Sequence, residues 1–170
     1  MNTTLKLYTL NYNEVKTYLW ASFFVVCNMV LPQLFHLIPQ GGIIFAPLSF
    51  IILAGSYKFG WKTGLLAAVA SPIVNHFVFG MPAWGVLQVM VVKLAIIALV
   101  AGLAAQYFRK ATFLLIIAVV LVSALLGGIS ELLLTGGITA TIADFVIGWP
   151  GLILQVVGTY AILHFIDNHR

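Results

Sequence analysis

Long runs of apolar residues, separated by short polar or Gly- and Pro-rich segments, follow one another along the whole chain. A helix needs roughly 20 apolar residues to cross the hydrocarbon core of a bilayer. The runs lie at 16–38, 43–57, 60–79, 83–105, 112–134 and 146–166. None of them alternates steadily between apolar and polar residues, which argues against transmembrane β-strands. We therefore predict an all-α membrane protein, a compact bundle of six transmembrane helices forming one domain over residues 1–170.

The second run is short, and Pro47 lies near its start. This indicates a partly irregular entry into the membrane or a local thinning of the bilayer rather than a clean span. The first run is longer than the apolar part of a typical signal peptide and has no clear small-residue cleavage site. We expect it to remain in the protein as a helix.

The composition supports a membrane protein. Hydrophobic residues make up 62% of the 170 residues and charged residues only 7%, with a mean hydropathy of +1.12. A soluble domain of this size could not bury that much apolar surface. Within the predicted helices, Lys93 and Glu131 are the only formal charges well inside an apolar run.

The basic residues predict the orientation, because Lys and Arg in short loops favour the cytoplasmic side. Apart from Lys93, they all belong to one side of the predicted bundle: Lys6, Lys16, Lys58, Lys62, Arg109, Lys110 and Arg170. The opposite loops, near 36–42, 79–83 and 135–145, have no Lys or Arg. We expect a multi-pass protein of the cell inner (plasma) membrane with both termini cytoplasmic. This topology accounts for the net charge of +4, so no nucleic-acid partner is needed to explain it.

Polar residues gather in the outer part of the predicted bundle. Counted from the outer helix ends at about 1.5 Å per residue, the outer third contains Asn75, His76, Trp84, Gln88, Glu131 and Trp149. Lys93 and Gln155 lie nearer the midplane, and the inner halves are mostly aliphatic. An ion path would need polar groups at all depths, so the pattern favours a cup that opens outward. These eight residues are the candidate substrate contacts.

Each candidate also has an alternative interpretation. Trp84 and Trp149 suit the interfacial aromatic belt, and the polar side chains at 75, 76 and 88 suit hydrogen bonds between helices. Lys93 is about 180° round the helix from Trp84 at 3.6 residues per turn, so its place in the cup is open. It could instead extend toward the interface or pair with Glu131.

Small residues form a row in the third predicted helix, where Gly60 and Gly64 make a GxxxG pattern that Ala68 continues. Such rows let helix backbones approach closely. They serve either packing within the chain or docking against another membrane protein. The single cysteine, Cys27, cannot form an internal disulfide and suits a small buried side chain.

Several Gly- and Pro-containing motifs together resemble one family. They are Gly42-Ile-Ile-Phe-Ala-Pro47, Ala54-Gly55 followed by Phe59-Gly60-Trp61-Lys62-Thr63-Gly64, Ser71-Pro72, Phe79-Gly80-Met81-Pro82 and Gly148-Trp149-Pro150-Gly151-Leu152-Ile153-Leu154-Gln155. With the size and the six helices, this pattern resembles the substrate-binding S components of energy-coupling factor vitamin transporters.

The resemblance implies a membrane-embedded binder of a vitamin or related micronutrient. It also implies two kinds of partner, a transmembrane coupling subunit and two cytoplasmic ATPases, and this chain has no Walker A loop of its own. Helix 1 of that family often carries an AxxxA docking surface, whereas here Val25 follows Ala21 at that spacing. Either docking uses a variant surface, with Ala21, Ser22, Gly60 and Gly64 as candidates, or the shared module is not used.

Two other function classes are an enzyme and a structural membrane protein. An enzyme would need a nucleophile with a base, or a metal cluster, and the four histidines do not form such a pattern. We therefore expect no enzyme activity, no cofactor and no metal site. A structural or assembly membrane protein without a solute site is the main alternative, since buried polar groups can simply tie helices together.

Overall fold

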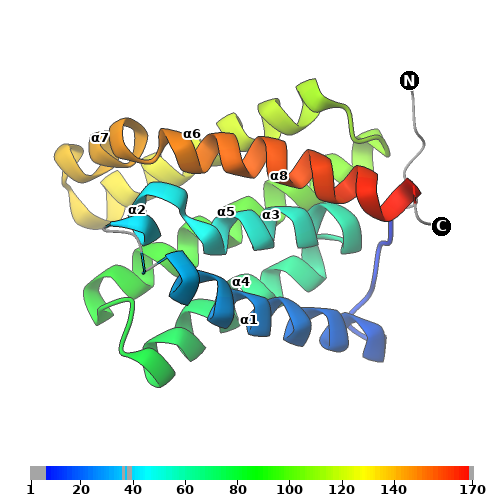
Figure 1. Cartoon of the computed structure of the whole chain (residues 1–170), viewed down its shortest axis with the longest axis horizontal. Coiled ribbons are helices and arrows are strands. Elements are labelled where there is room, and N and C mark those ends of the chain that lie inside the picture. The colour runs from blue at the N-terminus through cyan, green and yellow to red at the C-terminus, as the bar shows by residue number, and fades with distance from the viewer. Residues whose placement is uncertain (1–6, 36, 38–39, 169–170) are drawn as a thin grey trace.

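The computed structural model describes residues 7–35, 37 and 40–168, and these residues form helices and no strand. The helices are α1 (Val15–Phe35), α2 (Gly41–Phe45), α3 (Pro47–Phe59), α4 (Trp61–Phe79), α5 (Trp84–Phe108), α6 (Phe113–Thr135), α7 (Ile138–Ile147) and α8 (Trp149–Asn168). The long helices lie side by side and alternate in direction, so that α1 begins and α8 ends at the same end of the bundle (Figure 1). The all-α class is confirmed.

Four of the described helices, α1, α4, α5 and α6, are long and apolar enough to cross a membrane. α3 has 13 residues. At about 1.5 Å per residue it reaches roughly 20 Å, less than the hydrocarbon core of about 30 Å. In α8 the apolar stretch, Trp149–Phe165, is slightly shorter than a full membrane span. These helices indicate a membrane protein, but they do not establish six spans.

The second predicted run, 43–57, is divided at Ala46. This residue has a left-handed backbone with φ 42°, and Pro47 begins α3 directly after it. Proline suits the first turn of a helix, where its missing N–H would have no helical partner in any case. The short apolar run therefore corresponds to two helices, α2 and α3, joined by a sharp change of direction.

The segment 135–145, expected as a loop, contains most of α7. Ile138, Ile142 and Val146 recur every four residues, which places them on one face of this helix. All three are exposed. The helix is only 10 residues long, about half of a membrane span, so a prediction based on long apolar runs does not include it.

α3 lies at the centre of the bundle and packs against α1, α4, α5 and α8. Every residue of α3 from Ile52 to Phe59 is buried. Two glycines permit close helix approach: Gly64 of α4 lies directly against Ser56, and Gly102 of α5 lies against the backbone of Trp61. A larger side chain at either glycine would overlap these neighbours, so this half of the bundle is tightly packed.

The end of the bundle where α1 begins is fastened by hydrogen bonds. The Tyr8 N–H donates to the Lys58 carbonyl at 2.9 Å, and the Tyr57 hydroxyl donates to the Lys110 carbonyl at 2.5 Å. Lys62 Nζ donates to Asn11 Oδ1 at 2.5 Å. The segment before α1, the α3–α4 turn and the α5–α6 loop are thereby brought together, and with them the described basic residues of the predicted cytoplasmic side.

A polar cluster joins α1 to α4 within apolar surroundings. Pro32 lies inside α1 and has no N–H, so the Asn28 carbonyl four residues earlier cannot form its usual helical bond. Asn75 Nδ2 of α4 donates to this carbonyl at 3.0 Å and to the Ser71 carbonyl at 2.9 Å. Asn28 Nδ2 donates to the Ser71 hydroxyl at 3.0 Å. Asn75 therefore supplies the donor that Pro32 lacks.

Replacing Asn75 by Ala should leave the Asn28 carbonyl without this donor and lower the free energy of unfolding by about 1–3 kcal/mol. Pro32→Ala restores an N–H at position 32, so Asn75→Ala should cost clearly less in that background. Thermal unfolding of the four proteins in one detergent measures the coupling. Equal losses in both backgrounds would show that Asn75 does not serve this carbonyl.

Candidate solute-binding site

A cavity of about 520 Å³ lies at the end of the bundle opposite to the start of α1 and to the basic residues of the predicted cytoplasmic side. Its wall is formed by the last turn of α1, by α2 and the start of α3, by the loop after α4, and by parts of α5, α6 and α8, with Phe145 of α7 at one side. Cavities of roughly 300–1,000 Å³ are typical of small-molecule sites. Most of the wall is aliphatic or contains methionine, with a few polar side chains among these residues.

The charged part of the wall is an ion pair between α5 and α6. Lys93 Nζ lies 2.7 Å from Glu131 Oε2, and the side chains are 22% and 12% exposed. Both residues line the cavity. Lys93 therefore reaches the cavity and also contacts Glu131, two possibilities that the sequence had left open.

One face of α6 supports this pair. Ser123, Gly127 and Glu131 recur every four residues, so they lie on the same side of the helix, and all three line the cavity. A Cβ added at Gly127 would lie 3.6 Å from Lys93 Cγ. The stem of the lysine thus passes over the surface that this glycine leaves open, which brings the ammonium group to Glu131 one turn further along.

Two of the predicted amides also line the cavity. Asn75, which is 4% exposed, is the α4 residue that bonds the Asn28 carbonyl of α1. Gln155 is buried on α8. The structure thus brings together four of the eight predicted substrate contacts, from α4, α5, α6 and α8: Asn75, Lys93, Glu131 and Gln155.

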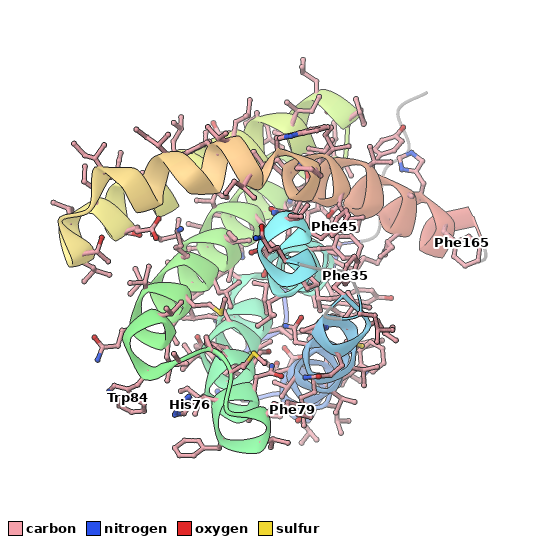
Figure 2. The ribbon with its side chains drawn as sticks, turned by 60° about the vertical axis from the view of Figure 1, so that its left-hand side comes forward. Phe35, Phe45, His76, Phe79, Trp84 and Phe165 are labelled. Carbon is pink, nitrogen blue, oxygen red and sulfur yellow. The ribbon has the colours of Figure 1, made fainter. Side chains whose placement is uncertain are left out.

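The other four predicted contacts lie outside the cavity wall. His76 Nδ1 lies 2.8 Å from the Pro82 carbonyl, and its ring centroid is 5.4 Å from that of Trp84. Figure 2 shows these two rings next to each other at the edge of the bundle. Trp84 and Trp149 are largely exposed, as is Gln88. Their exposure agrees with the interfacial interpretation of the two tryptophans.

The sequence interpretation missed several residues of the cavity wall. They include Pro32, Gln33, Gln40, Ser49, Met90, Ser123, Gly127 and Phe145. Small residues on α6 carried a usable signal, because positions 123 and 127 precede Glu131 by two turns and one turn on the same face. The contributions of α2 and α7 depend on chain turns, and no periodic pattern in the sequence indicates those.

The docking candidates differ in their surroundings. Ala21 is buried in the bundle. A Cβ added at Gly60 would lie 3.3 Å from the Tyr8 carbonyl oxygen, and Gly64 lies against Ser56. Contacts within the chain therefore account for these three small residues, whereas Ser22 is exposed on α1.

Among the described residues, no group of three His, Cys, Asp or Glu side chains could hold a metal ion. No protein-family model, curated protein or solved structure matches the chain.

Removing one partner of the Lys93–Glu131 pair should destabilise the protein, because the other charge then lacks its counterion in a site of low polarity. For Lys93→Met we expect a loss of about 1–3 kcal/mol, less than for a fully buried pair because both side chains contact the cavity. The double variant Lys93→Met/Glu131→Gln should recover most of it. Thermal unfolding of single and double variants measures this.

A matched control is Lys16→Met, at an exposed position of α1 at the opposite, basic end, where a loss of about 0.5 kcal/mol or less is expected. If the two single losses at positions 93 and 131 simply add in the double variant, the pair is not coupled.

Proposed function

We propose that the chain is a membrane-embedded substrate-binding subunit for uptake of a vitamin or related micronutrient, working with an ATP-driven coupling module. The observation that carries the proposal is the cavity of about 520 Å³, whose wall contains the Lys93–Glu131 pair. Ionisable residues in membrane helices are costly, and they usually mark a solute or ion pathway. The resemblance to S components of energy-coupling factor transporters supports the same function.

In this proposal the chain crosses the inner membrane six times, with α2 and α3 acting together as the second crossing. α3 supplies roughly 20 Å of this crossing, and α2, which runs in a different direction, adds the outer part from Gly41 to Phe45. The basic end then faces the cytoplasm with both termini, following the distribution of Lys and Arg. The cavity opens toward the outside, and α7 lies at the outer surface.

The chemistry of the wall suggests how a solute is held. The ammonium group of Lys93 suits a carboxylate or phosphate. Without solute, Glu131 serves as its counterion, so the charge is never left alone in apolar surroundings. The aliphatic and methionine side chains contact the apolar body of the solute, while Asn75 and Gln155 provide neutral hydrogen-bonding groups.

Transport requires partners in this proposal, because the other half of the bundle is tightly packed. Ile52, Ile116 and Leu163 are almost completely buried. A solute cannot pass through such packing without large rearrangement. A transmembrane coupling subunit and two cytoplasmic ATPases would supply the energy, and the exposed face of α1 around Ser22 is the proposed docking surface.

A structural or assembly role is the competing function. It is favoured by the Asn28–Ser71–Asn75 cluster, which ties α1 to α4 regardless of any solute. Such a scaffold would gain no stability from a small molecule, whereas a binder is stabilised by its ligand through mass action. Solute binding therefore separates the two functions.

We expect mass spectrometry to identify a small organic molecule released from gently purified protein. Rebinding of that molecule should weaken by about 1.5–3 kcal/mol in Lys93→Gln, the range for a hydrogen bond to a charged group. Gln155→Ala should weaken it by about 1 kcal/mol. The control is Gln88→Ala, at an exposed position of α5 outside the cavity, which should bind as the native protein does. A protein that releases no solute and is stabilised by none would be a scaffold.

A change in the docking surface should affect uptake but not solute binding. Ser22→Trp should abolish uptake in cells that contain the partner subunits, because a bulky side chain holds a neighbouring helix away, and solute binding should not change. Leu125→Trp, at an exposed position of α6, is the matched control and should leave both unchanged. Uptake into liposomes that contain this chain alone would contradict the proposed partner dependence.

A further inference from the structure

We infer that the cavity contains a second subsite, at Ser123 on α6, that binds a neutral hydrogen-bonding group of the solute. This inference rests on the proposed function, since it describes the same cavity. It goes further by naming a residue that the sequence did not indicate and by restricting the shape and chemistry of the solute.

The hydroxyl of Ser123 is buried and has no partner within the described part of the chain. The residue is 3% exposed, its Oγ forms no hydrogen bond there, and it lines the cavity. Serines in helices commonly bond a carbonyl of the preceding turn. Ser130 of the same helix does so with the Gly127 carbonyl at 2.7 Å, and Ser56 of α3 with the Ile52 carbonyl at 2.6 Å.

An unsatisfied buried hydroxyl is costly, so such a group normally has a partner. Ser123 is one of the residues that line the cavity. A hydroxyl both donates and accepts, which suits a neutral hydroxyl, amide or ring N–H. A group in the solute is therefore the natural partner for Ser123 Oγ.

The position of Ser123 restricts the length of the solute. Ser123 and Glu131 are two turns apart on one face of α6, which corresponds to about 12 Å along the helix axis. Lys93 extends along this face, over Gly127, to reach Glu131. A solute that contacts both the ammonium group and Ser123 must therefore be elongated, on the order of 10 Å.

Between Ser123 and Glu131, the α6 residues that line the cavity are small and apolar. Met90 and Leu94 of α5, Ala124 and Gly128 of α6, and Leu152 of α8 line the cavity. None of these side chains forms a strong hydrogen bond. The solute class is thus an elongated molecule with an anionic group at one end, an apolar middle and a neutral hydrogen-bonding group at the other end.

Three probes with one skeleton test this class. 4-(4-Hydroxyphenyl)butanoate has all three parts, 4-phenylbutanoate lacks the neutral group, and 4-(4-hydroxyphenyl)butan-1-ol lacks the charge. We expect the first to bind most tightly to native protein in nanodiscs by titration calorimetry. Loss of the phenol hydroxyl should weaken binding roughly 3- to 10-fold, the range for one net hydrogen bond.

The Ser123→Ala variant locates the effect. This variant should weaken the binding of 4-(4-hydroxyphenyl)butanoate by the same factor and leave the binding of 4-phenylbutanoate unchanged. Its melting temperature without probe should not fall, because the change removes a hydroxyl that has no described partner. Ser130→Ala is the matched control, since that hydroxyl bonds within α6, and it should bind all three probes as the native protein does.

Two results would overturn the inference. One is an equal effect of Ser123→Ala on both acids, and the other is failure of the complete probe to bind more tightly than the two partial ones. Either result leaves the proposed function intact if the protein still releases and rebinds its own solute through Lys93. Absence of any such solute would instead remove the proposed function.

Discussion

A backbone in apolar surroundings has no water to bond, so its N–H and C=O groups must find partners within the chain. Helices satisfy this requirement by themselves except where a residue interrupts them. Pro32 is such an interruption in α1, and the Asn75 side chain of α4 supplies the missing donor to the Asn28 carbonyl. The non-helical backbone at Ala46 and the loop after α4 both lie against the cavity. Irregular backbone thus lies beside the cavity, and at the opposite end it occurs in the segment before α1 and in the turns at Gly60 and Arg109.

The same requirement explains why the two charges inside the apolar runs lie together. An isolated ammonium or carboxylate at this depth would be expensive, whereas a contact of 2.7 Å between them lowers that cost. The lysine stem passes close to Gly127 on its way to Glu131, with Lys93 Cγ 3.6 Å from where a Cβ of residue 127 would lie. The pair lies in the cavity wall and not in the packed half, so a solute can reach both charges. A purely structural ion pair would have no need for this exposure.

How far the sequence predicts the fold and the site depends on the physical signal. Helices such as α5 and α6 were found because long apolar runs have few alternative structures in a membrane. α7 and the turn at Ala46 were not predicted, because a short helix and a single left-handed residue produce no long apolar run. Lys93, Glu131, Asn75 and Gln155 could be found because polar residues are rare at this depth. Depth does not give rotation about the helix axis, so Trp84 and Gln88 were grouped with them although they point elsewhere.

The small residues raise a different question, namely which neighbour they pack against. For Gly60 and Gly64 the sequence left open packing within the chain or docking against a partner, and contacts with Tyr8 and Ser56 in the same chain use both glycines. These contacts also restrict movement, because packed interfaces shift as units and do not deform gradually. The half of the bundle around α3 therefore has little freedom to rearrange when a solute enters. Residues of α2, of the loop after α4 and of α7 form one side of the cavity, and most of the described side chains there are exposed or half-buried. Local opening costs least where few contacts are lost, so these elements are the part of the cavity wall that opens most easily.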